Sequence, residues 1–113
     1  YDPIGDCYAE PAFRSIGWKG KYLVVGFAAG QIPKLPINLT LLKGASVVGV
    51  FWGAFTGREF EENQKNIADI NLLLSNGDIK PLISKKIPME DAIEAINLIG
   101  SRGVVGKVVL VNK

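Results

Sequence analysis

The sequence contains no histidine and only one cysteine, Cys7. Histidine is the usual general base and the commonest metal ligand, so its absence excludes Ser-His and Cys-His nucleophile pairs formed within this chain. A single cysteine forms neither an internal disulfide nor a cysteine-rich metal site. We therefore expect these residues to bind no metal, and we expect a reducing, cytoplasmic location.

The sequence also lacks a strong charge of one sign and a long apolar run. Its 13 basic and 11 acidic residues leave a net charge of +2, and the lysines are scattered, which argues against nucleic-acid binding. The longest apolar run, residues 45–55, is too short to cross a bilayer, so we expect no membrane span. The chain has no initiator methionine or signal peptide, and residues 1–5 are typical of a strand end. We expect a soluble piece of a larger protein.

What the sequence does contain is an alternation of helical and extended patterns along 113 residues, 48% of them apolar. This length and composition suit one globular domain or less. Apolar spacing predicts helices at 9–16, 38–43 and 88–99, a helix after a Thr56-x-x-Glu59 capping box that ends at Asn76, and strands at 21–27, 46–55, 81–87 and 107–111. The alternation predicts an α/β fold with parallel strands.

The strands at 21–27 and 46–55 carry apolar residues on both faces, so we expect both of their faces to be covered. Gly49 and Gly53 would leave room for another group to approach the second strand. A domain boundary is expected near residues 76–81, because a complete strand-helix unit ends there. The predicted parts are therefore 1–76 and 77–113.

Several stretches together resemble the medium-chain dehydrogenase/reductase superfamily, and most closely its zinc-free NADPH:quinone oxidoreductase branch. They are YDPIG, GWKGKYLVVGFAAGQIPKLPINLTLLKGASVVGVFWGAF, NGDIKPLI and GVVGKVVLV, in the same order as in that family. The resemblance implies a C-terminal fragment. Residues 1–76 would be the second half of a Rossmann-type dinucleotide-binding domain, and 77–113 the return to a GroES-like catalytic domain. Asp6 or Cys7 stands where the family usually has a second glycine.

The resemblance implies NADPH as the cofactor and assigns residues to its nicotinamide half. They are Val25, Gly26, Phe27 and Ala28 in one loop, and Phe51, Trp52 and Gly53 in another. Ligands of doubly wound sheets bind beyond the carboxyl ends of the strands, and glycine lets a ring approach the backbone. Hydride transfer to a quinone or conjugated carbonyl needs orientation more than a histidine base. No catalytic side chain is assigned.

Alternatives remain open for these residues. Gly26 and Phe27 fit a plain strand end, Trp52 fits the core, and the 46–55 strand fits either a central strand or the homodimer edge that the resemblance implies. The whole protein is alternatively a zinc-dependent alcohol dehydrogenase of the same superfamily, or a non-catalytic module that self-associates. We expect the piece alone to be inactive and to bind NADPH weakly, since the glycine-rich phosphate loop would lie upstream. The sequence does not specify the substrate.

Overall fold

The computed structural model describes residues 1–112, and the chain divides into two compact units. The first unit runs from Tyr1 to Asn63, and the second begins at Gln64. Helices alternate with parallel strands in both units, so the predicted α/β class is confirmed.

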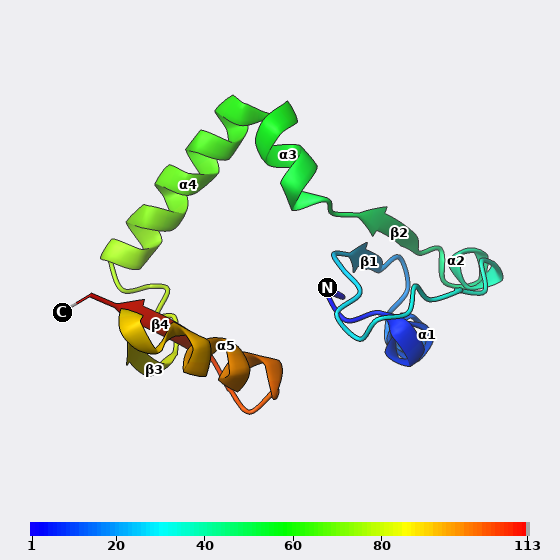
Figure 1. Cartoon of the computed structure of the whole chain (residues 1–113). Helices are drawn as coiled ribbons and strands as arrows, with labels where there is room; N and C mark the ends of the chain where they lie inside the picture. Colours follow the sequence, from blue (N-terminus) through cyan, green and yellow to red (C-terminus); the bar gives the residue numbers. More distant parts are fainter. Residues whose placement is uncertain (113) are drawn as a thin grey trace. The chain divides into compact units, whose positions relative to one another are not determined.

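The first unit is built on a short parallel sheet (Figure 1). Strand β1 (Lys21–Val24) pairs with β2 (Ser46–Gly49) in parallel, from Lys21 opposite Ser46 to Val24 opposite Gly49. Asp2 forms an isolated parallel bridge with Val24, so the opening segment lies along β1. The helices of this unit are α1 (Ala9–Ser15), α2 (Asn38–Lys43) and α3 (Trp52–Arg58), with a 3-10 turn at Asp6–Tyr8.

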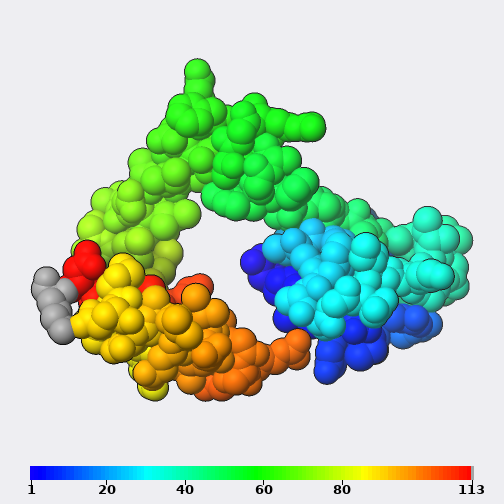
Figure 2. Space-filling model, viewed as in Figure 1, coloured from blue at the N-terminus to red at the C-terminus, as the bar shows by residue number. Residues whose placement is uncertain are grey.

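The core of the first unit lies between α1, β1 and α2. Phe13 is fully buried, and its ring meets Tyr22 edge-on with ring centres 5.3 Å apart. Ala9 and Leu39 complete the buried cluster. The loop between β1 and α2 forms much of the visible surface of this unit (cyan in Figure 2).

The second unit contains a second parallel strand pair. Helix α4 (Phe60–Ser75) leads into it, and β3 (Ile83–Pro88) pairs in parallel with β4 (Lys107–Val111). A 3-10 turn at Met89–Asp91 and α5 (Ala92–Gly100) connect the two strands. Ile87 and Ala95 are the buried apolar residues of this unit. Within residues 1–112, no helix is long and apolar enough to cross a membrane.

Two predicted strands are shorter in the structure than in the sequence-based prediction. The predicted 46–55 strand ends at Gly49, and α3 begins at Trp52. The apolar character of residues 50–55 does not distinguish a strand from a helix, and the run was assigned to the wrong element. The predicted 21–27 strand ends at Val24. The residues that follow form a loop whose amides donate hydrogen bonds to the carbonyls of residues 2–4.

The predicted capping box at Thr56 and Glu59 is wrong. Thr56 lies inside α3, and its hydroxyl donates a hydrogen bond to the carbonyl of Gly53 at 3.0 Å. The predicted covering of the second strand is also absent within this unit, because Val47 and Val48 are 44% and 39% exposed. Both faces of β2 are thus open among the residues described.

Asp6 occupies a backbone conformation that favours glycine, with φ at 54°. This is where the resemblance would place a second glycine. We expect Asp6→Gly to raise the free energy of unfolding by about 0.5–1 kcal/mol, since a side chain in the left-handed region is strained. The gain is partly offset because the Asp6 carboxylate accepts a hydrogen bond from the Cys7 amide at 2.7 Å.

Urea unfolding of the chain, followed by tryptophan fluorescence, measures this effect. Asp6→Ala is the matched control, because it loses the same hydrogen bond but keeps the strained Cβ. It should therefore be less stable than the wild type. A glycine variant that is also less stable would mean that the hydrogen bond outweighs the strain.

Candidate functional site

A hollow of about 300 Å³ lies where β1 and β2 end. It is lined by Val24, Val25, Gly26, Phe27, Gly49, Val50 and Phe51. The carboxyl ends of both parallel strands open into it, which is where ligands of α/β sheets bind. The lining is apolar, with Phe27 38% and Phe51 78% exposed. Such a surface suits a flat, uncharged ring rather than an anion or a metal ion.

The loop at 25–29 is held against the opening segment of the chain by backbone hydrogen bonds. The amides of Val25 and Gly26 donate to the carbonyl of Asp2, at 2.9 and 3.3 Å. The amides of Ala28 and Ala29 donate to the carbonyls of Pro3 and Ile4, both at 3.0 Å. These amides are therefore not available to donate hydrogen bonds to a ligand. The residues of this loop that line the hollow are Val25, Gly26 and Phe27.

The Asp2 carboxylate stabilises the conformation of residues 2–5, the segment whose carbonyls accept these hydrogen bonds. One oxygen accepts hydrogen bonds from the amides of Ile4 and Gly5, at 2.8 and 2.9 Å, and the other accepts one from the hydroxyl of Tyr22. The Tyr22 hydroxyl, then the Gly5 amide, lower the pKa of Asp2 below its usual value. Burial, and then the bond to Asp2, raise the pKa of Tyr22 to about 12.

The raised pKa of Tyr22 predicts a loss of stability in alkali. The folded chain holds the phenol proton more tightly than the unfolded chain, so the contribution is complete below pH 10 and is lost between pH 10 and about 12. We expect this loss to be about 3 kcal/mol, because the pKa is raised from 10 to about 12 at roughly 1.4 kcal/mol per unit. The lowered pKa of Asp2 has the opposite pH dependence. Its contribution to the free energy of unfolding is lost in acid, as the pH falls through that lowered pKa.

Tyr22→Phe isolates the tyrosine contribution. The difference in unfolding free energy between wild type and Tyr22→Phe, measured with urea, should shrink as the pH rises from 9 to about 11.5. A constant difference across that range would contradict the raised pKa.

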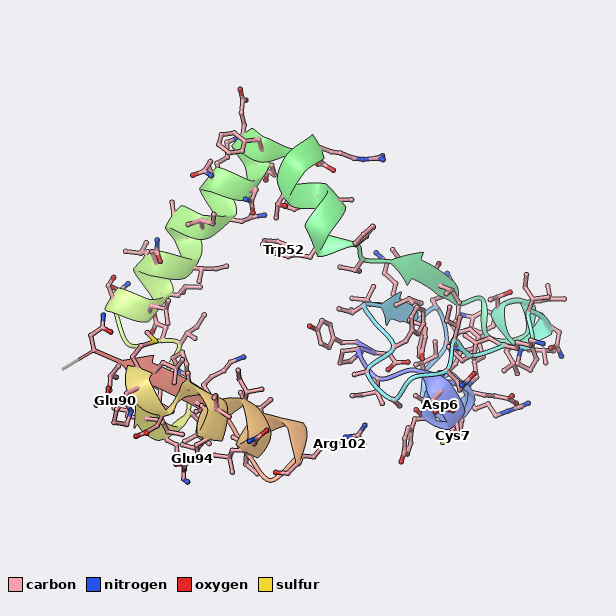
Figure 3. The ribbon with its side chains drawn as sticks, viewed as in Figure 1. Asp6, Cys7, Trp52, Glu90, Glu94 and Arg102 are labelled. Atoms are coloured by element: carbon pink, nitrogen blue, oxygen red, sulfur yellow. The ribbon has the colours of Figure 1, made fainter. Side chains whose placement is uncertain are left out.

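The predicted site residues fall into two groups. Val25, Gly26, Phe27 and Phe51 line the hollow together. Ala28 lies further along the first loop, while Trp52 and Gly53 form the first turn of α3 and do not line it. Trp52 is 51% exposed and packs against Phe55 with ring centres 5.5 Å apart, so in this unit it does not fill the core (Figure 3).

Sequence reasoning missed part of the site. Val24, Gly49 and Val50 complete the lining and were not among the predicted site residues. Val24 and Val50 carry no motif, because they are ordinary residues at strand ends. The role of Asp2 was also missed, since its partner Tyr22 lies 20 residues away in the sequence.

A larger hollow of about 580 Å³ lies elsewhere in the same unit, beside Asp6 and Cys7 (Figure 3). Arg14, the guanidinium in its wall, is already paired with Glu10 at 2.6 Å.

Parallel strands that end at an apolar hollow define an α/β protein with a candidate ligand site at the edge of its sheet. Residues 1–110 match the family described as zinc-binding dehydrogenase. Quinone oxidoreductase-like protein 2 of Bos taurus is 34% identical over 106 residues, covering 94% of this chain and 30% of that protein. Its homologue from Nematostella vectensis is 34% identical over 113 residues, covering 99% of this chain and 31% of the relative.

A solved mycobacterial structure, Rv1454c in complex with NADPH, has the same fold. It superimposes with a TM-score of 0.80 at 22% sequence identity, covering 98% of this chain and 34% of that one. The chain belongs to the zinc-binding dehydrogenase family, within the medium-chain dehydrogenase/reductase superfamily, and its fold is part of a Rossmann-type architecture. It spans about a third of the length of the relatives it matches.

Residues 1–112 do not supply the set of ligands that the zinc ion in the family's name would require. The sequence has no histidine, and residues 1–112 contain no cluster of three cysteine, aspartate or glutamate side chains that would hold a metal ion. Zinc favours four nitrogen or sulfur ligands, so the donor set here does not fit it.

Proposed function

We propose that this chain forms the nicotinamide side of the cofactor site in an NADPH-dependent oxidoreductase. The observation that carries the proposal is the apolar hollow at the ends of β1 and β2, lined by glycine and phenylalanine side by side. The family, the curated relatives and the NADPH-bound mycobacterial structure support it. The adenosine and phosphate parts of the cofactor would contact segments outside this chain.

The residues of the hollow fit the chemistry of a reduced nicotinamide. Gly26 and Gly49 leave the backbone accessible, and the partly exposed rings of Phe27 and Phe51 offer an apolar wall against which a flat ring can pack. When bound, NADPH supplies a hydride, and the protein supplies orientation and dryness. A quinone or conjugated carbonyl would accept that hydride together with a proton from solvent, which completes its two-electron reduction. The other predicted residues, Ala28, Trp52 and Gly53, would then flank the ring rather than line it.

We also propose the assembly and the location of the whole protein. The amides of Ser46 and Val50 donate to the carbonyls of Gly20 and Val24, at 3.0 and 2.8 Å, on the β1 side of the strand. The alternating amides of Val47 and Gly49 therefore face the outer edge of β2. A second copy could pair there, although the pairing strand is 46–49 rather than 46–55. The single exposed cysteine suits a reducing cytoplasm. Residues 1–76 remain the proposed cofactor-domain part, and 77–113 the catalytic-domain part.

The test of the function uses the whole protein that contains this chain. We expect a quinone to accelerate the disappearance of the NADPH absorbance, and NADPH deuterated at C4 to transfer its deuterium and slow the reaction. Activity should survive dialysis against a chelator. An absence of turnover with quinones and enones would overturn the proposed function. Activity lost with the metal and restored by zinc would favour the alcohol dehydrogenase alternative.

A further inference from the structure

The conformation of the 25–29 loop depends on a segment more than 20 residues away in the sequence. Backbone carbonyls of residues 2–4 accept the amides of Val25, Gly26, Ala28 and Ala29. No side chain of the loop itself takes part in these bonds. The position of the loop is therefore set by the shape of the opening segment, in the same way that one strand fixes the register of another.

That shape is in turn set by one side chain. The Asp2 carboxylate accepts the amides of Ile4 and Gly5 at 2.8 and 2.9 Å, which closes residues 2–5 into a turn. The hydroxyl of Tyr22, a residue only 3% exposed, fixes the other carboxylate oxygen to the core. The turn is thus anchored to β1 at one end and to the loop at the other.

The turn also sets the position of Phe27, a side chain of the hollow. Gly5 has φ at 70°, and a Cβ placed on it would lie 2.8 Å from the ring of Phe27. The ring therefore rests against the bare α-carbon of Gly5. Because Asp2 holds the Gly5 amide, the carboxylate, Gly5 and Phe27 form a continuous line of contact into the hollow.

We propose that Asp2 is a positioning residue for the nicotinamide half of the cofactor, acting through the turn at residues 2–5 on the 25–29 loop. The proposal rests on the function proposed above. Asp2 itself does not line the hollow and is not a catalytic residue. Losing its carboxylate would move the wall against which the ring is held, while leaving contacts to the adenosine half unchanged.

The test compares two ligands of the whole protein by calorimetric titration. NADPH contains the nicotinamide, whereas 2′,5′-ADP contains only the adenosine half. We expect Asp2→Ala to weaken NADPH binding by about tenfold or more and to leave 2′,5′-ADP binding within about twofold of the wild type. Asp2→Asn keeps an acceptor oxygen for the amides, so it should recover most of the lost affinity. Asp69→Ala, an exposed aspartate on α4, is the control.

Gly5→Ala provides a second variant if Asp2→Ala fails to fold. It keeps the carboxylate but pushes the Phe27 ring, so it should show the same selective loss of NADPH affinity. Equal loss of both ligands in folded variants, or no loss of either, would overturn the role of Asp2. A wild-type protein that binds neither ligand would instead overturn the proposed function.

Discussion

Phe13→Ala is expected to lower the free energy of unfolding of the first unit by about 3–5 kcal/mol, as is typical for removal of a buried aromatic ring. Phe13 is the largest fully buried side chain among the described residues. Its ring meets Tyr22 edge-on at 5.3 Å, so the variant also loses an aromatic contact. A small unit has few other buried residues with which to compensate, and the cavity would lie beside the hydroxyl that holds Asp2.

Urea unfolding monitored by tryptophan fluorescence reports on this unit, because Trp18 and Trp52 both belong to it. Phe60→Ala is the matched control, since the same atoms are removed from a side chain that is 61% exposed. It should change the unfolding free energy by less than about 1 kcal/mol. A loss in Phe13→Ala no greater than in the control would contradict the core described above.

Gly49→Val in the whole protein is expected to raise the Michaelis constant for NADPH by about tenfold or more and to slow hydride transfer, since a branched side chain would stand at the hollow. Gly49 lines the hollow, and no atom of the structure lies within 4 Å of a Cβ built on it. The fold should therefore tolerate the valine. Gly26→Val is a less selective choice, because its Cβ would lie 3.4 Å from the Pro3 carbonyl and the branches would strain the turn.

The control for this variant is Gly17→Val, which also meets no atom within 4 Å but does not line the hollow. It should leave the Michaelis constant for NADPH unchanged. Unchanged kinetics in a folded Gly49→Val protein would mean that the ends of β1 and β2 are only strand ends.

The sequence predicted the order and type of most elements because their patterns are local. The helix at residues 38–43 and its end at Gly44, with φ at 55°, follow from spacing and a glycine that accepts the left-handed conformation. The prediction was wrong for residues 50–55, because their apolar character suits strand and helix alike. The strand ends at Gly49, and a helix begins at Trp52.

The candidate site was predictable only in part, for a related reason. Glycines at the ends of apolar runs indicate where a sheet opens, so the two loops could be assigned from the sequence together with the family resemblance. The hydrogen bonds that hold one loop could not be, because Asp2 and Tyr22 are remote in sequence and neither belongs to a motif of paired residues. Non-local polar contacts of this kind leave no periodic signal.

The most direct test of the nicotinamide site is a crystal structure of the whole protein with bound NADPH. We predict that the nicotinamide ring lies at the hollow, within van der Waals contact of Gly26, Phe27 and Gly49, while the adenosine half lies against segments outside this chain. A nicotinamide ring bound away from the ends of β1 and β2 would contradict the proposed site.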